Sequence, residues 1–144
     1  MEEFDLIVIG SGAGTNVASG AAQKGHHVAL VDRGPTGGTC LNCGCIPSKM
    51  LIYPADVIRS IQDARNIGVH AELHEVDFEK IMSRMHGVVD EARRNLEESL
   101  DKAEGLTYIK ERAELVGDYV LKVGEKTITS QKIVIATGAR SLLP

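Results

Sequence analysis

Three cysteines are the residues in this sequence that could most directly carry out chemistry. Cys40, Cys43 and Cys45 lie within six positions and are the only cysteines of the 144-residue chain. Thiols clustered in this way serve redox chemistry or bind a metal ion. Structural zinc sites usually draw on two separated pairs of ligands, which this cluster does not offer. The spacing therefore favours redox chemistry over zinc, and no metal site is predicted.

The surroundings of the cysteines favour a reactive thiol. A helical turn between Cys40 and Cys45 would bring their Cβ atoms near disulfide-bonding distance. A predicted helix begins beside Cys45, and a helix N-terminus lowers the pKa of a nearby thiol and favours the thiolate. Lys49, one turn later, adds positive charge.

A glycine-rich loop, Gly-Ser-Gly-Ala-Gly-Thr, precedes the cysteines at residues 10–15. It lies between a predicted strand and a predicted helix, which is the context of a dinucleotide-binding loop. In such a loop Gly10 permits the tight turn, and Gly12 lets a pyrophosphate approach the backbone at the helix N-terminus. Thr15 stands where the usual pattern has its last glycine. We expect Gly14 to provide the close helix packing instead.

Asp32 ends the second predicted strand, where a carboxylate accepts hydrogen bonds from an adenosine ribose. An ordinary aspartate in a turn is the alternative, and the glycine-rich loop favours the ribose role. Loop and carboxylate together do not distinguish NAD from FAD.

The elements that must position these residues follow from the apolar pattern. Short apolar runs at 4–9 and 27–31 flank a small-residue helix at 14–24. This order is typical of a βαβ unit in a parallel sheet. A further helix is expected after Gly44, and Pro54 should kink it or end it early.

The second half of the sequence combines a long helix with short strands. Apolar residues from 78 to 103 form one stripe at helical spacing, which we expect to pack in the core, with Asp77 as N-cap. Short β segments follow from Leu106, and the apolar run 133–136 is predicted to return to the parallel sheet. The predicted fold class is α/β, a Rossmann-like domain with a βαβ unit, a long helix and a small antiparallel β-meander.

Composition narrows the classes of partner. Charged residues are 25% and hydrophobic residues 43% of the chain, an ordinary soluble balance. The net charge is −4, aromatic residues are 3% and the basic residues form no run, so no nucleic acid partner is expected. No apolar run is long enough to span a membrane, and the acidic start at Met1–Glu3 is unlike a signal peptide. We expect one domain in the cytoplasm, with no membrane partner.

Residues 37–49, Gly-Gly-Thr-Cys-Leu-Asn-Cys-Gly-Cys-Ile-Pro-Ser-Lys, resemble the signature of the flavin-dependent pyridine nucleotide–disulfide oxidoreductases. That family includes dihydrolipoamide dehydrogenase and the glutathione, mycothione and mercuric reductases. Residues 45–49 are most similar to dihydrolipoamide dehydrogenase, while Met50 and the apolar stretch after it also resemble the mycothione and mercuric branches. The likeness resumes at 136–140, which is similar to the segment closing the first part of the family's FAD domain.

The resemblance implies FAD as cofactor, NAD(P)H as reductant of the full-length family, and a redox-active disulfide between Cys40 and Cys45. Cys45 would face the flavin as the charge-transfer thiol, Cys40 would exchange with the substrate, and Lys49 would lie near the reactive edge of the flavin. The implied catalytic residues are Cys40, Cys45 and Lys49. The expected cofactor-binding residues are Gly10, Gly12, Gly14, Asp32, Arg33, Gly38, Thr39, Lys49, Ala113, Thr137 and Gly138.

Cys43 departs from the family pattern, which usually has valine there. It is interpreted as a small core residue. The alternative is a third thiol able to rearrange the disulfide.

The family's other domains lead to an expectation about the extent of this chain. Family members also carry a nicotinamide domain and a dimerisation domain, and we expect residues 1–144 to be the N-terminal part of the FAD-binding domain without them. Such a part should lack NAD(P)H turnover by itself and self-associate, whereas the full-length family forms homodimers. The expected partner is a small dithiol or disulfide, or a lipoyl domain. The alternative is a stand-alone flavin-binding or thiol-redox module.

Overall fold

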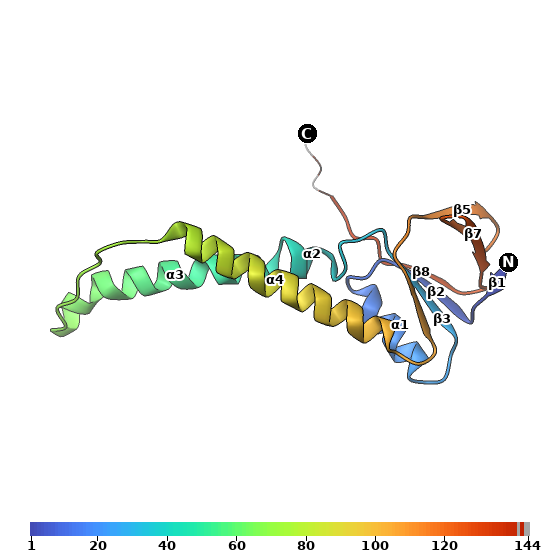
Figure 1. Cartoon of the computed structure of the whole chain (residues 1–144), viewed down its shortest axis with the longest axis horizontal. Coiled ribbons are helices and arrows are strands. Elements are labelled where there is room, and N and C mark those ends of the chain that lie inside the picture. Colours follow the sequence, from blue (N-terminus) through green and yellow to red (C-terminus); the bar gives the residue numbers. More distant parts are fainter. Residues whose placement is uncertain (141, 143–144) are drawn as a thin grey trace.

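Strands and helices alternate through the first third of the chain, which then extends into a long helical hairpin (Figure 1). The computed structural model describes residues 1–140 and 142. The helices are α1 (Gly14–Ala22), α2 (Gly38–Asn42), α3 (Cys45–Asp63), the 3-10 helix η1 (Ala64–Ile67) and α4 (Phe78–Asp101). The strands are β1 (Glu2–Glu3), β2 (Leu6–Ile9), β3 (Val28–Val31), β4 (Leu106–Ile109), β5 (Ala113–Gly117), β6 (Val120–Val123), β7 (Lys126–Thr129) and β8 (Ile133–Ile135).

A parallel sheet carries the site, with strand order β4-β3-β2-β8. The two central strands are the apolar runs recognised in the sequence, and all four residues of β3 are buried because both faces of the sheet are covered. β8 pairs with β2, which confirms that the run at 133–136 returns to this sheet. β4 pairs with β3, so the first of the short β segments belongs to the parallel sheet as well.

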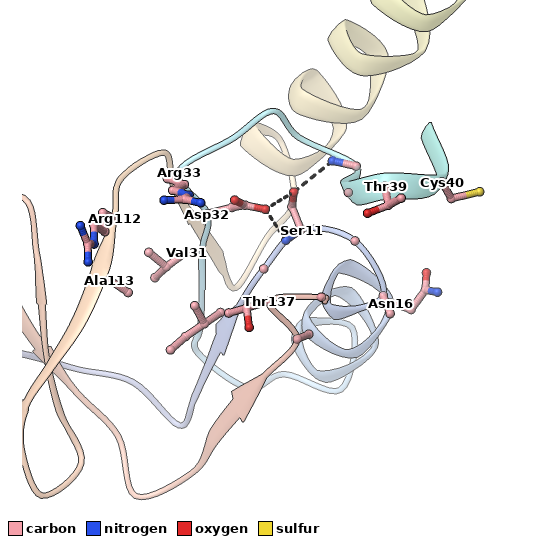
Figure 2. A pocket seen from close by; sticks show the side chains of 18 of the residues that line it. Ser11, Asn16, Val31, Asp32, Arg33, Thr39, Cys40, Arg112, Ala113 and Thr137 are labelled. Atoms are coloured by element: carbon pink, nitrogen blue, oxygen red, sulfur yellow. Dashed lines mark hydrogen bonds between the residues drawn. The ribbon is translucent and has the colours of Figure 1, made fainter. Parts of the chain in front are cut away.

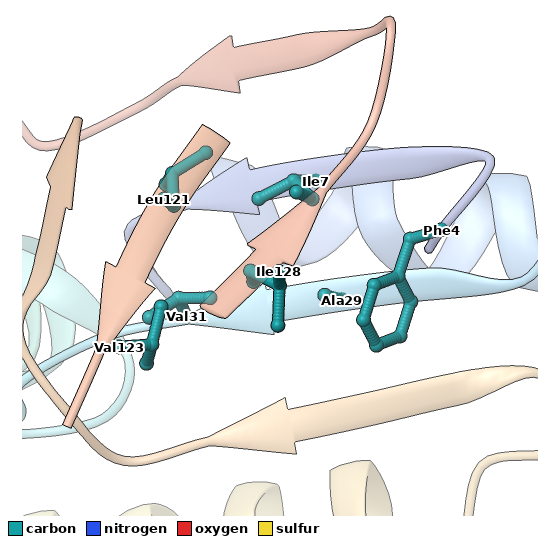
Figure 3. Packing of buried hydrophobic residues seen from close by; sticks show 7 residues of the cluster. All are labelled: Phe4, Ile7, Ala29, Val31, Leu121, Val123 and Ile128. Atoms are coloured by element: carbon teal, nitrogen blue, oxygen red, sulfur yellow. The ribbon is translucent and has the colours of Figure 1, made fainter. Parts of the chain in front are cut away.

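A second sheet is formed by the antiparallel meander β5-β6-β7, with β1 added parallel to β7. It packs on one face of the parallel sheet, where Figure 3 shows side chains from both sheets meeting. That cluster consists of Phe4, Ile7, Ala29, Val31, Leu121, Val123 and Ile128. Helices α1 and α4 cover the other face, around Val8, Leu30 and Leu100. The predicted α/β fold with a small meander is therefore confirmed, as three layers around two apolar clusters.

The hairpin of α3 and α4 extends away from the sheets (Figure 1). Pro54 does not end α3 early, since the helix continues to Asp63. α3 packs against α4. Asp77 caps α4 as predicted, since its carboxylate accepts from the backbone N–H of Lys80 at 2.9 Å. No helix among residues 1–140 and 142 is both long and apolar enough to cross a membrane.

The expectation that the whole apolar stripe of α4 packs in the core was wrong at Phe78 and Val88. Met85, Val89 and Leu100 are buried, whereas Phe78 is 65% and Val88 38% exposed. The reason is the hairpin itself, because the start of α4 lies beyond the sheets and has only α3 to pack against.

Candidate functional site

The glycine-rich loop connects β2 to α1 at the edge of the parallel sheet where its strands end. Gly10 donates its N–H to the carbonyl of Val31 and lies against the end of β8. Its φ is +107°, and a Cβ there would overlap the carbonyl oxygen of Ala136. Only glycine fits this position, because both the backbone conformation and the neighbouring strand exclude a side chain.

Gly14 brings α1 onto the sheet. A Cβ at this position would come within 2.8 Å of Cγ1 of Val8, so a side chain would push the helix off β2. Thr15 fits at the next position because its hydroxyl turns back and donates to the carbonyl of Ser11 at 2.6 Å. The close packing is therefore provided by Gly14, as we expected from the unusual place of Thr15.

Gly12 and Gly38 bring two loops into contact. A Cβ on Gly38, whose φ is +63°, would lie 2.7 Å from Cα of Gly12. The reverse contact is looser, since a Cβ on Gly12 would meet only Cα of Gly38, at 3.5 Å. The protein's own packing thus requires glycine at position 38 and not at position 12.

An open cavity of about 840 Å³ lies over these loops, between the parallel sheet, the start of α2 and the segment before β5 (Figure 2). The predicted cofactor-binding and catalytic residues that line it are Gly10, Gly12, Asp32, Arg33, Gly38, Thr39, Cys40, Ala113, Thr137 and Gly138. Gly14, Cys45 and Lys49 are not part of its lining. Three polar residues of the wall were not predicted from the sequence as site residues, namely Ser11, Asn16 and Glu111.

Asp32 is held firmly in the cavity wall. Its Oδ2 accepts from both the backbone N–H and the hydroxyl of Ser11, each at 2.6 Å, and its Oδ1 accepts from the N–H of Gly34 at 2.9 Å. The Ser11 hydroxyl in turn accepts from the N–H of Gly37, at 3.0 Å (Figure 2). Asp32 therefore ties the glycine-rich loop to the loop before α2, in addition to facing the cavity.

A second polar network connects the loop before α2 to helix α4 and strand β4. The buried hydroxyl of Thr36 lies 2.7 Å from Oε1 of Glu97 and 2.6 Å from the hydroxyl of Tyr108, and Lys110 pairs with Glu97 at 2.7 Å. Hydrogen bonds from Lys110 and Thr36 lower the pKa of the Glu97 carboxyl, and burial raises the pKa of the Tyr108 hydroxyl. Charged Glu97 and neutral Tyr108 are thus the forms that this network stabilises.

Cys40 lies in α2 and Cys45 is the first residue of α3, and the two side chains are neighbours. Both are free thiols, and a hydrogen bond with the Cys45 side chain raises the pKa of the Cys40 thiol, while the nearby charge of Lys49 acts in the opposite direction. The approach depends on Gly44, because a Cβ there would come within 2.9 Å of the Thr39 carbonyl oxygen and 3.2 Å of Cα of Cys40. In Figure 2 the sulfur of Cys40 points away from Ser11 and Thr137, so the thiol lies at the far end of the cavity.

Cys43 is exposed, so the interpretation of this residue as a small core side chain was wrong. It is the C-cap of α2, and its backbone N–H closes the helical turn on the carbonyl of Thr39 at 3.0 Å. A residue that ends a one-turn surface helix has no core to enter. Across the described ranges 1–140 and 142, no group of three or more His, Cys, Asp or Glu side chains could hold a metal ion.

Comparison with known proteins places this arrangement in a family. The model of the family described as pyridine nucleotide-disulphide oxidoreductase matches residues 4–144. The chain belongs to this family. Dihydrolipoyl dehydrogenase of Chlamydia pneumoniae is 39% identical over 142 residues, which are 96% of this chain and 31% of that protein. Mercuric reductase of Staphylococcus aureus is 32% identical and aligns with 99% of this chain and 26% of its own length.

A solved structure agrees with the family assignment. The HOCl-induced flavoprotein disulfide reductase RclA from Escherichia coli superposes on 97% of this chain with a TM-score of 0.76 and 30% sequence identity. The matched part is 29% of the RclA chain. This member of the pyridine nucleotide-disulphide oxidoreductase family therefore spans less than a third of the length of these relatives.

The structure brings remote segments of the chain together at the site. In this oxidoreductase family member the loops at Gly10, Gly38 and Thr137 lie around one cavity although they are far apart in the sequence. The polar residues that were missed carry weaker signals. Ser11 stands between two glycines and reads as a small spacer, and Glu111 falls in a connection whose position the local pattern does not reveal.

Proposed function

We propose that the chain binds FAD in the cavity and passes electrons between the flavin and a redox-active Cys40–Cys45 pair, as part of a dihydrolipoamide dehydrogenase-like NAD(P)H:disulfide oxidoreductase. One observation carries the proposal. Cys40, whose thiol neighbours that of Cys45, lines one end of a glycine-lined cavity whose wall also holds the carboxylate of Asp32. Thiols and a dinucleotide-type cavity are thereby joined in one site.

The residues of the cavity fit FAD. The lack of a side chain at Gly12 leaves space in the cavity. Packing within the protein does not require this glycine, since a Cβ there would make only an ordinary contact with Gly38. The start of α1 presents backbone N–H groups beside Gly12, and helix N-termini attract phosphates. Arg33 and Arg112 add positive charge to the wall near Asp32. Bound FAD would supply the two-electron chemistry that amino-acid side chains lack.

The thiol pair would exchange electrons with a dithiol substrate by two displacements. In the first, a substrate thiolate attacks Sγ of Cys40, the Cys40–Cys45 bond breaks and Cys45 leaves as a thiolate. In the second, the other substrate thiolate attacks the mixed disulfide and Cys40 leaves as a thiolate. The substrate loses two electrons as it becomes a disulfide, and the cysteine pair gains them. Lys49 is placed to favour thiolates, because its charge reaches Cys40.

A dihydrolipoamide-type dithiol is the substrate class that the relatives favour. The dihydrolipoyl dehydrogenase is 39% identical, against 32% for the mercuric reductase, over nearly the same part of the chain. A mercuric or mycothione-type reductase remains the second candidate, since reductases of these kinds align along almost the whole chain. A stand-alone flavin-binding or thiol-redox module is the third.

The test is a titration of the purified chain with FAD, followed by oxidation of the cysteines and reaction with two thiols. We expect saturable binding and the loss of one disulfide per chain on adding dihydrolipoamide, at lower concentration than with glutathione. A Cys45→Ala variant should bind FAD and form no such disulfide. Equal reactivity toward both thiols would argue against the substrate class, and no binding of FAD would overturn the cofactor assignment.

A further inference from the structure

Asn42, between the two proposed redox cysteines, is joined to the surrounding loop through its side-chain amide. Its Nδ2 lies 2.8 Å from the carbonyl oxygen of Gly38, 3.0 Å from that of Thr36 and 3.3 Å from that of Pro35. These carbonyls belong to the loop before α2 and to the first residue of α2. A five-residue helix has little stability of its own, so these side-chain bonds help to define the turn that carries Cys40.

Arg93 of α4 fixes the direction of that amide. Its Nε donates to Oδ1 of Asn42 at 2.9 Å, and the side chain is 32% exposed. An amide whose oxygen is occupied by a guanidinium must turn its Nδ2 toward the carbonyls on the other side. Asp90, one turn earlier on α4, pairs with the guanidinium at 3.3 Å and helps to hold it in place.

α4 contacts the same loop again one turn after Arg93. Glu97 accepts from the hydroxyl of Thr36, and Asn42 donates to the carbonyl of that same Thr36. Residues four apart lie on one face of a helix, so α4 presents a cation and an anion to the loop side by side. The long helix is a rigid support for a segment that has few apolar contacts of its own, since no residue of α2 is buried.

We propose that Arg93 is a positioning residue for the redox pair, acting through Asn42 to hold Cys40 opposite Cys45. This inference rests on the proposed function. Closing a disulfide in a turn that is already formed requires less loss of chain freedom than closing it in a loose one. Loosening the turn should therefore weaken the disulfide, while the helix that carries Arg93 remains folded.

The experiment measures the equilibrium between the dithiol and the disulfide in glutathione redox buffers, in a Cys43→Ser background so that one pair alone can form. Arg93→Met should lower the equilibrium constant for disulfide formation about fivefold, the loss expected for one charge-assisted hydrogen bond at a partly exposed site. Arg93→Lys keeps a donor and should recover much of the loss. Arg94→Met is the matched control, because Arg94 is exposed on the same helix and should leave the equilibrium unchanged.

A double-mutant cycle identifies the route of the effect. If Arg93 acts through Asn42, then Arg93→Met should cause no further loss in an Asn42→Ala chain. Circular dichroism of each variant reports the helix content, so unfolding is separated from a loosened turn. Equal equilibrium constants for Arg93→Met, Arg94→Met and the parent chain, or full additivity in the cycle, would overturn the positioning role alone. Failure of the parent chain to form any Cys40–Cys45 disulfide would instead overturn the proposed function, and the positioning role with it.

Discussion

Ser11 donates two hydrogen bonds to the same oxygen of Asp32, one from its backbone N–H and one from its hydroxyl, both at 2.6 Å. Ser11 is almost fully buried, and both of these donors are satisfied by the Asp32 carboxylate. The carboxylate predicted from the sequence to bind a ribose thus joins the two loops that form the cavity wall.

Asp32→Ala should lower both stability and flavin affinity. The buried N–H and hydroxyl of Ser11 would lose their acceptor, which costs roughly 1–3 kcal/mol in the free energy of unfolding. Urea unfolding and a titration with FAD measure the two effects. Ser11→Ala is the matched control, since it keeps the backbone bond to Asp32 and should have the smaller effect on both. Unchanged flavin affinity in Asp32→Ala would remove Asp32 from the ribose site.

Gly10→Ala and Gly12→Ala should separate folding from cofactor binding. At Gly10 a Cβ overlaps the Ala136 carbonyl, so we expect a loss of several kcal/mol in the free energy of unfolding, on the order of the larger single-residue effects. At Gly12 a Cβ makes an ordinary contact, so stability should change little while FAD affinity falls, because the methyl group enters the cavity. Thermal melts with and without FAD measure both effects. A Gly12→Ala chain that binds FAD as tightly as the parent would contradict the proposed phosphate approach.

Oxidation of the chain should join Cys40 to Cys45 and leave Cys43 free. Cys45 is the residue whose side chain already interacts with Cys40, and Gly44 allows the close approach. Peptide mapping without reductant identifies the pair. Cys43→Ser should leave the bridge unchanged, whereas Cys45→Ser should abolish it. A dominant Cys40–Cys43 bridge in the parent chain would show that Cys43 is an exchanging third thiol.

Alkylation of Cys40 should respond to its two neighbours in opposite directions. The hydrogen bond with Cys45 raises the pKa of the Cys40 thiol, so Cys45→Ala should lower that pKa and speed alkylation by iodoacetamide near neutral pH. The charge of Lys49 lowers the same pKa, so Lys49→Met should shift the pH–rate profile upward. The profiles are measured in a Cys43→Ser background, so that Cys43 does not react. Identical profiles for all three chains would show that neither neighbour affects the Cys40 thiol.

Glu97→Gln should reduce stability at neutral pH and have a smaller effect in acid. Hydrogen bonds from Lys110 and Thr36 lower the pKa of Glu97 in the folded chain, so its contribution is complete above the pKa of an unfolded glutamate, about 4.5. The contribution is lost as pH falls through the folded-state pKa. Because the pair with Lys110 is partly exposed, the difference at pH 7 should be about 1 kcal/mol or less. Urea unfolding at pH 7 and pH 3.5 checks this. A difference that grows in acid would contradict the sign.

The sequence by itself determined the features that depend on near neighbours. The central strands, the starts of α1 and α4, and the return of β8 to the parallel sheet all follow from apolar period, glycine position and a capping aspartate within a few residues. The cysteine spacing and the glycine-rich loop likewise indicated a redox and dinucleotide site before any fold was known. Pro54 shows the limit of this reasoning, because α3 continues past it to Asp63 although proline usually kinks or ends a helix.

The tertiary structure alone decided which polar groups meet across long stretches of chain. Ser11 with Asp32, Asn42 with Arg93 and Thr36 with Glu97 join residues separated by 21, 51 and 61 positions. All six residues are serine, threonine, asparagine or charged residues, which are common on protein surfaces. The type of such a residue therefore does not predict its partner. Their meeting depends on how α4 crosses the sheet and on how closely Gly12 and Gly38 let two loops approach. Those are properties of the packed layers, since no local pattern specifies the distance between segments that are remote in sequence.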